Sequence, residues 1–201
     1  MRRRSCESGA PRAPSASRTK AAFLGGRSLS SDTAACFSFG ASAPEAEATY
    51  ALILDSVSDL KPFAGREIDV GPWLTITQDR IDQFAEATED RQWIHVDGER
   101  AKRESPYGAT IAHGFLTLAL VSHFLKQVVE IRGAKLAVNY GLNRVRFPEA
   151  VRVGSKIRAR VGLASFQESA GAVDFTFQVT ILVEGREKPC CVADWLVRYY
   201  R

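Results

Sequence analysis

The feature that most constrains the fold is a change of hydrophobic period part-way along the chain. Residues 114–131 form the longest apolar-periodic stretch, and they leave hardly any polar face before Lys126. A helix that is apolar nearly all round is buried. After Gly133, which is placed to end that helix, apolar residues recur at every second position, as they do in β-strands. The chain therefore predicts one buried helix and a sheet that covers it.

Four long alternating segments follow the helix. They are residues 135–147, 155–168, 173–184 and 188–200, and the connections between them have the length of hairpin loops. The segments predict an antiparallel meander.

The segment before the buried helix predicts one strand and two helices. Residues 67–77 alternate as a strand does, with Gly71 and Pro72 marking a bend. Thr77 is placed to cap one helix, and Asp97 opens a shorter polar helix that runs to about Glu104. The order of strand, helices, buried helix and meander predicts a single α+β domain.

We expect this domain to span residues 57–201 and residues 1–56 to be a disordered N-terminal extension. Up to residue 48 the sequence is low in complexity and rich in Arg, Ser and Ala. Two alternatives stay open. An organellar transit peptide is also rich in Arg and Ser and poor in acids. An over-extended gene start is the other, since Met1 is the only methionine and Val57 is a plausible place for a shorter product to begin.

Charge and cysteine content exclude several classes of protein. Of the net charge of +4, residues 1–50 contribute seven basic and four acidic residues, which leaves 20 basic and 19 acidic residues in the body. A near-neutral body argues against nucleic-acid binding, which needs a concentrated basic face. No apolar run reaches the ~18–20 residues of a membrane span. The four cysteines have no metal-type spacing and make no disulfide framework, so we expect a cytoplasmic protein, or one of an organellar matrix if residues 1–50 are a transit peptide.

Asp90 and His95 are the first candidates for chemistry. They lie five residues apart in a polar loop, and Trp93 and Ile94 between them would anchor that loop in the core. An Asp and a His that both reach one water molecule can orient it and move its protons. The alternative is an ordinary surface pair.

Gly114 is the second candidate because it opens the buried helix. Its backbone N–H is one of the unpaired donors of a helix N-terminus and could stabilise a developing oxyanion. The alternative is a glycine needed only for close packing. We interpret His113 as a structural neighbour of the helix cap, Ser122 as bonded to a carbonyl one turn back, and His123 as a residue without a role.

Three segments in order, Asp90-x4-His95, Gly108-x2-Ile111-Ala-His-Gly114 and Ser122, resemble the MaoC-like dehydratases, which include the (R)-specific enoyl-CoA hydratases. Residues 92–97 and 142–148 are similar to the branch related to the nodulation N protein. The resemblance covers residues 58 to 201. The family has the hot-dog fold, in which an antiparallel sheet wraps one long central helix and two copies form a homodimer through their sheet edges.

The resemblance implies an activity and residue roles. The substrate would be a trans-2-enoyl thioester of coenzyme A, hydrated to a (3R)-hydroxyacyl-CoA or formed from it by dehydration. Asp90 and His95 would hold the water, the N–H of Gly114 would bind the thioester oxygen, and Ser122 would support Asp90. Coenzyme A is then part of the substrate, with no separate cofactor and no metal. Many relatives have Asn-Pro where this chain has Gln92-Trp93, which puts the chain-length preference in doubt.

Two other functions share the predicted fold. A hot-dog thioesterase usually carries its carboxylate on the central helix, and residues 114–131 hold no acid before Glu130. A non-catalytic acyl-thioester-binding protein would keep the loop residues only for structure. The sequence leaves open the acyl chain length, the pathway, and whether the carrier is coenzyme A or acyl carrier protein.

Overall fold

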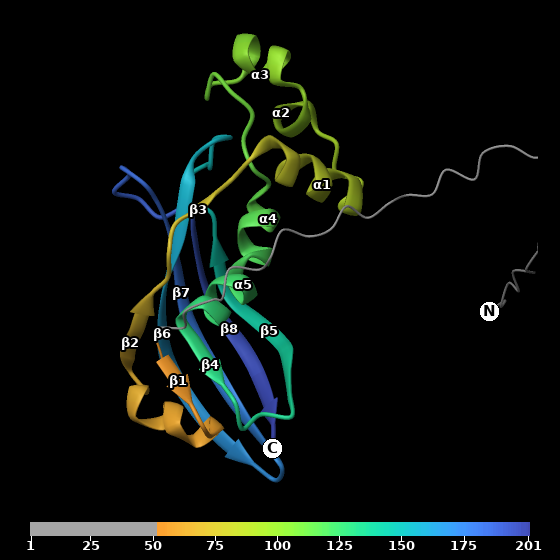
Figure 1. The fold of residues 1–201 in the computed structure, drawn as a ribbon. Helices are drawn as coiled ribbons and strands as arrows, with labels where there is room; N and C mark the ends of the chain where they lie inside the picture. Colours follow the sequence, from red (N-terminus) through yellow and green to blue (C-terminus); the bar gives the residue numbers. More distant parts are fainter. Residues whose placement is uncertain (1–51) are drawn as a thin grey trace, which may run out of the picture. The chain divides into compact units, whose positions relative to one another are not determined.

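The computed structural model describes residues 52–201 (Figure 1), and what we expect of residues 1–51 falls outside them. The helices are η1 (Val57–Phe63, a 3-10 helix), α1 (Gln78–Thr88), α2 (Trp93–Val96), α3 (Gly98–Glu104), α4 (Gly114–Ala119) and α5 (Val121–Val128). The strands are β1 (Leu52–Leu54), β2 (Arg66–Val70), β3 (Leu74–Thr75), β4 (Val129–Ile131), β5 (Leu136–Arg146), β6 (Lys156–Ser169), β7 (Ala172–Val183) and β8 (Cys191–Tyr200).

The four late strands form the predicted antiparallel meander. The main sheet has the order β2-β6-β7-β8-β5, and β3 also pairs with β6. Each pair in it is antiparallel, and β6 and β7 form a hairpin that closes at Ser169 and Ala172. The predicted first strand is divided at Gly71 and Pro72 into β2 and β3, as the bend there indicated.

The buried helix is confirmed, although it is built from two segments. Leu120 alone separates α4 from α5, and its backbone remains in the helical region. Figure 1 shows α4 and α5 lying along one face of the main sheet. Phe124 and Val128 of α5 are fully buried against that face, and burial of a side chain of this size stabilises the fold by roughly 1.5–3 kcal/mol. The α+β prediction is confirmed, and the sheet and helix are those of a hot-dog domain.

The end of the helix differs from the prediction. The helix stops at Val128, and Val129–Ile131 form strand β4, which pairs in parallel with β1. Val129 has an extended backbone and its side chain is buried, so the apolar run continues as a strand instead of a further helical turn. The apolar pattern could not reveal this change, because a short buried strand and a buried helix turn have the same composition.

The partner strand β1 lies in the segment that we expected to be disordered. Leu52–Leu54 pair with Val129–Ile131, and Ser56 caps η1 by accepting a hydrogen bond from the N–H of Ser58. A Cβ atom added to Gly133 would collide with the backbone carbonyl of Asp55. Residues 52–56 are therefore part of the fold, and the boundary expected at residue 57 is wrong for them.

Helices α1, α2 and α3 lie between β3 and α4 and position the candidate residues. The hydroxyl of Thr77 accepts a hydrogen bond from the N–H of Arg80, and the carboxylate of Asp97 accepts one from the N–H of Arg100, so both predicted helix caps are confirmed. Figure 1 shows α1, α2 and α3 together beyond one end of the main sheet, close to α4. In the part of the chain from residue 52 onward, no helix is long and apolar enough to cross a membrane.

Candidate active site

A helix, a hydrogen bond and a ring stack together fix the orientation of His95. It lies in the one-turn helix α2, and its Nδ1 is 2.7 Å from the carbonyl oxygen of Ile111. A carbonyl oxygen can only accept, so Nδ1 carries the proton and Nε2 keeps its lone pair. The ring of His113 stacks on that of His95, with 3.7 Å between the ring centroids and 26° between the ring planes. The result is an oriented imidazole whose Nε2 is available as a base.

Gln78 holds the backbone of His95, a role that we did not predict. Its Nε2 donates to the carbonyl oxygen of His95 and to Oδ1 of Asp82, both at 2.8 Å, and its Oε1 accepts from the hydroxyl of the buried Thr110 at 2.5 Å. This one amide joins the start of α1 to α2 and to the segment before α4. The sequence shows only that Gln78 directly follows the helix cap Thr77, and this position does not predict a contact with His95.

Burial determines the protonation state of His95. The residue is only 8% exposed, and this burial lowers the pKa of the imidazole below its ordinary value of 6.5. The hydrogen bond to Ile111 and the charge of Asp90 act in the opposite direction, while the neighbouring His113 lowers the pKa further. A neutral imidazole at neutral pH can accept a proton, as a general base must.

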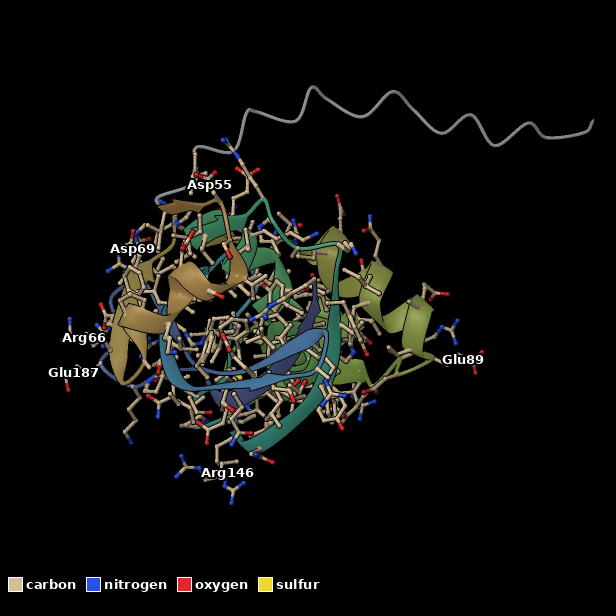
Figure 2. The ribbon with its side chains drawn as sticks, turned by 90° about the horizontal axis from the view of Figure 1, so that it is seen from below. Asp55, Arg66, Asp69, Glu89, Arg146 and Glu187 are labelled. Carbon is tan, nitrogen blue, oxygen red and sulfur yellow. The ribbon has the colours of Figure 1, made fainter. Side chains whose placement is uncertain are left out.

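Asp90 supplies a carboxylate next to this imidazole. Glu89 adopts a left-handed conformation (φ 59°) at the end of α1, which turns the chain so that Asp90 follows outside the helix. Figure 2 shows Glu89 at the outer end of α1 with its side chain pointing away from the domain. Asp90, His95 and His113 each contribute one nitrogen or oxygen atom to a group in which all atoms lie within 4.8 Å of one another. The structure thus brings the predicted pair together.

One nitrogen of each histidine in this group is already engaged, since Nδ1 of His95 donates to Ile111 and Nε2 of His113 lies 2.9 Å from the carbonyl oxygen of Asp90. The free nitrogen of His95 and the carboxylate of Asp90 together can orient a water molecule and move its protons. These three residues are also the ones that could hold a metal ion, since metal-binding histidines engage their second nitrogen in the same way.

Gly114 begins α4 and lines a cavity that also reaches His95. The first N–H groups of a helix have no partner within it, so the N–H of Gly114 is a potential donor. A Cβ atom on Gly114 would lie 3.1 Å from the ring of Phe147, which is closer than nine in ten such contacts. Figure 2 shows Arg146 pointing away from the domain, and the next residue, Phe147, faces Gly114 instead. Gly114 therefore packs closely against Phe147 and also offers an N–H that has no partner within the helix.

The cavity beside Gly114 has a volume of about 230 Å³. The residues in its wall come from α2, the segment between α3 and α4, α4 itself and the segments before β6 and β8. They include His95, Tyr107, Ile111, Gly114, Phe147, Glu149 and Cys190. Cys190 is not a nucleophile, because burial raises the pKa of its thiol to about 12. His95 is the residue of this wall that combines a buried, oriented imidazole with a free ring nitrogen, so it stays the candidate general base.

A family comparison agrees with this geometry. The model of the MaoC like domain matches residues 59–184, which is more than half of the chain. The chain belongs to the MaoC-like dehydratase family. It is therefore an enzyme of the hydro-lyase type.

Two curated relatives and one solved structure illustrate the similarity of this MaoC-like chain. The 3-hydroxyacyl-thioester dehydratase Z of Mycobacterium tuberculosis is 50% identical over 146 residues, which cover 72% of this chain and 96% of the relative. Nodulation protein N of Rhizobium leguminosarum bv. viciae is 43% identical over 143 residues, covering 70% and 89%. The monoamine oxidase regulatory protein from Archaeoglobus fulgidus superposes with a TM-score of 0.61 at 22% identity, covering 76% of this chain and 98% of that chain.

Ser122 lines a different pocket of this MaoC-like chain from His95 and Gly114. Its hydroxyl is 3.5 Å from the carbonyl oxygen of Ala119, and within residues 52–201 it makes no hydrogen bond to Asp90. It lines a second, mostly apolar groove of about 390 Å³ between the central helix and strands β5 and β8. The lining includes Phe115, Leu118, Ser122, Asn139, Leu142 and Trp195. The support of Asp90 by Ser122 stays a prediction.

Proposed function

We propose that the chain interconverts trans-2-enoyl-CoA and (3R)-hydroxyacyl-CoA thioesters, as an (R)-specific hydratase and dehydratase. The observation that carries the proposal is the pairing of a neutral, oriented imidazole, His95, with the carboxylate of Asp90 at a cavity. Water addition needs a group that takes a proton and a group that orients the water. The curated relative that is named a 3-hydroxyacyl-thioester dehydratase supports a thioester substrate.

In the hydration direction, Asp90 and His95 hold one water molecule between them. Nε2 of His95 has the free lone pair and accepts a proton from this water as the oxygen adds to C3 of the enoyl group. A proton is delivered to C2, so the elements of one water molecule are added across the double bond. In the dehydration direction the same groups remove the proton from C2 and the hydroxyl from C3.

The thioester oxygen gains negative charge during this reaction, and in our proposal the N–H of Gly114 stabilises it. A donor aimed at the developing oxyanion draws charge from C3 and makes it open to attack by water. Gly114 lies in the wall of the same cavity as His95, so one bound thioester can reach both residues.

The apolar groove beside the central helix is proposed to take the acyl chain. Phe115 belongs to the wall of this groove and Phe147 to that of the cavity beside His95, and the two rings meet edge to face with 6.0 Å between their centroids. The groove and the cavity are thus adjacent, so that one substrate can extend from one into the other. We further propose that neither a metal nor a separate cofactor takes part, since the steps above use only protein groups and the thioester.

We propose that the enzyme is a homodimer that pairs through β5. Strand β5 is at the end of the main sheet order, and ten of its eleven residues are exposed, among them Leu136, Val138, Tyr140 and Leu142. An exposed apolar edge strand is normally paired or covered. A second copy about a two-fold axis would cover it and would also close the apolar groove, which β5 lines.

An assay with three readouts tests the activity and its alternatives. Purified protein is given crotonyl-CoA, and separately (3R)- and (3S)-hydroxybutyryl-CoA, while enoyl absorbance, hydroxyacyl product and free thiol are followed. Our proposal expects interconversion of the enoyl and (3R) compounds without thiol release. Release of free coenzyme A would indicate a thioesterase. A hot-dog thioesterase usually carries a carboxylate on the central helix, whereas α4 and α5 contain no acidic residue. The same assay is repeated with acyl carrier protein thioesters. Binding of both kinds of thioester without turnover of either would indicate a non-catalytic protein.

A further inference from the structure

His113 touches both members of the proposed acid–base pair. Its ring stacks on the ring of His95 at 3.7 Å, and its Nε2 donates to the backbone carbonyl of Asp90 at 2.9 Å. It also directly precedes Gly114, whose N–H is the proposed oxyanion donor. One side chain therefore joins three elements, the turn after α1, helix α2 and the start of α4.

The stability of α4 does not explain a histidine at this position. His113 is the N-cap residue, but its side chain makes no capping hydrogen bond, whereas Ser, Thr, Asp or Asn would cap the helix. The side chain is almost completely buried, and its Nδ1 has no hydrogen-bond partner within residues 52–201. A buried polar atom without a partner is unfavourable, and a native example calls for an explanation. The contacts with His95 and Asp90 provide one.

Asp90 depends on this contact for its position. Its side chain is about half exposed, and its carboxylate makes no hydrogen bond within the described residues, where Nε2 of His113 lies 4.0 Å from its Oδ2. The hydrogen bond from His113 to the carbonyl oxygen of Asp90 is thus the side-chain contact that fixes the backbone of Asp90 beside His95. Without it, the turn that follows Glu89 can shift relative to α2.

We propose that His113 is a positioning residue that holds Asp90 and His95 in one geometry through its ring stack and its Nε2–H hydrogen bond. This inference rests on the proposed function, in which Asp90 and His95 share one water molecule. A displacement of about 1 Å between such groups can lower the rate about 10²-fold even when the substrate still binds.

Two substitutions separate the two contacts of His113. His113→Phe keeps a flat ring against His95 but has no donor for Asp90. His113→Gln keeps an amide N–H at about the reach of Nε2 but loses the ring stack. His123→Phe is the matched control, because His123 lies on α5, contacts Phe124 and is not part of the site. All four proteins, including the unmodified one, are compared as full chains for kcat, KM and Tm with crotonyl-CoA.

For His113→Phe we expect kcat to fall at least about 10-fold while KM changes less than about 3-fold. The Tm should be unchanged or higher, since the substitution removes a buried nitrogen that has no partner within residues 52–201. His113→Gln should recover part of the lost kcat, and His123→Phe should behave as the unmodified enzyme. A role in stability alone would lower Tm and would not give this separation of kcat from KM.

Unchanged kcat in His113→Phe would overturn the inference, and so would a loss of kcat that follows a matching loss of Tm in both variants. An unmodified enzyme without turnover would instead refute the proposed function. In that case the positioning role is still measurable by NMR in the free protein, because the 15N signals of the rings and of the Asp90 and Arg91 amides report the geometry. A Phe variant that leaves the two amide signals in place would then overturn the inference.

Discussion

The carbonyl oxygen of Ile111 lies 2.7 Å from Nδ1 of His95 and thereby decides which nitrogen of that ring can act as a base. Ile111 is in turn tied to α2, because its N–H donates to the carbonyl of Ile94 at 3.1 Å. The tautomer of His95 is therefore fixed by one side-chain-to-backbone hydrogen bond, and a backbone hydrogen bond between α2 and the segment before α4 holds its acceptor in place.

The first prediction concerns Asp90 and His95 themselves. Asp90→Asn and His95→Gln each remove proton transfer while keeping nearly the same volume, and we expect each to lower kcat by about 10²-fold or more. Asp90 is exposed and should be replaced without loss of Tm. Steady-state kinetics with crotonyl-CoA and thermal unfolding are the measurements. Near-normal turnover in either variant would refute the assignment of that residue.

The second prediction is a pH dependence. Burial lowers the pKa of His95, so the folded enzyme keeps the free base to a pH below 6.5, and the acid limb of kcat/KM for hydration should lie below 6.5. The folded state also binds fewer protons at this site than the unfolded state. The free energy of unfolding should therefore fall as the pH drops from about 6.5 through the folded pKa.

Comparison of His95→Gln with the unmodified enzyme isolates this contribution, since the variant lacks the group. The free energy of unfolding of both proteins is measured by urea denaturation across this range. As the pH drops, the unmodified enzyme should lose more stability than the variant. An acid limb above 6.5 would show that a different group is titrating.

The third prediction tests Gly114. A methyl group there would approach the ring of Phe147 to 3.1 Å, so Gly114→Ala must displace that ring and narrow the approach to the N–H. We expect a loss of kcat/KM of at least about 10-fold, as expected when an oxyanion donor is obstructed. Gly98→Ala is the control, because Gly98 also begins a helix but has no atom within 4 Å of the added carbon. Equal activity in the two variants would contradict an oxyanion role for Gly114.

The sequence was sufficient for the parts of the fold that depend on a repeated pattern. Alternation over ten or more residues predicted β5 to β8, and Thr77 and Asp97 predicted two helix starts. The three-residue strands β1 and β4 were missed, because they have too few residues to show a period and are stabilised by pairing with each other.

The same contrast holds within the site. Asp90 and His95 were predictable because they lie five residues apart in one short polar segment, although His95 belongs to the one-turn helix α2 and not to the expected loop. The contact of Gln78 with His95 joins residues 17 positions apart, and the stack of His113 on His95 joins residues 18 positions apart. Contacts of this kind arise only when the chain has folded, so the residues that hold the pair had no signal in the sequence.

The fourth prediction follows from the pairing of β1 with β4. A chain that begins at residue 57 lacks β1 and the cap of η1 at Ser56, so we expect a lower Tm than for a chain that begins at residue 52. Loss of the cap alone costs about 1 kcal/mol, to which the lost burial of Leu54 is added. Equal Tm values for the two truncated proteins would show that β1 contributes nothing to stability.

The fifth prediction concerns the homodimer. Leu136 and Val138 of β5 pair with Tyr200 and Arg198 of β8, and both are exposed at the end of the sheet order. Replacing both by Lys places two charges along this edge, which is a common way to block pairing between sheet edges. We expect light scattering at micromolar concentration to report a dimer for the unmodified chain and a monomer for Leu136→Lys/Val138→Lys.

A control variant and an activity measurement decide whether this edge matters for function. Ile53→Lys also places a charge on an exposed apolar strand residue, but on β1, so it should leave the dimer intact. If the second copy closes the apolar groove beside β5, the monomeric variant should show a raised KM for long acyl chains and a smaller change for crotonyl-CoA. The groove is lined by Asn139, Tyr140 and Leu142 of the same strand, so loss of the partner exposes it to water. A fully active monomer of the unmodified chain would refute both the dimer and the shared groove.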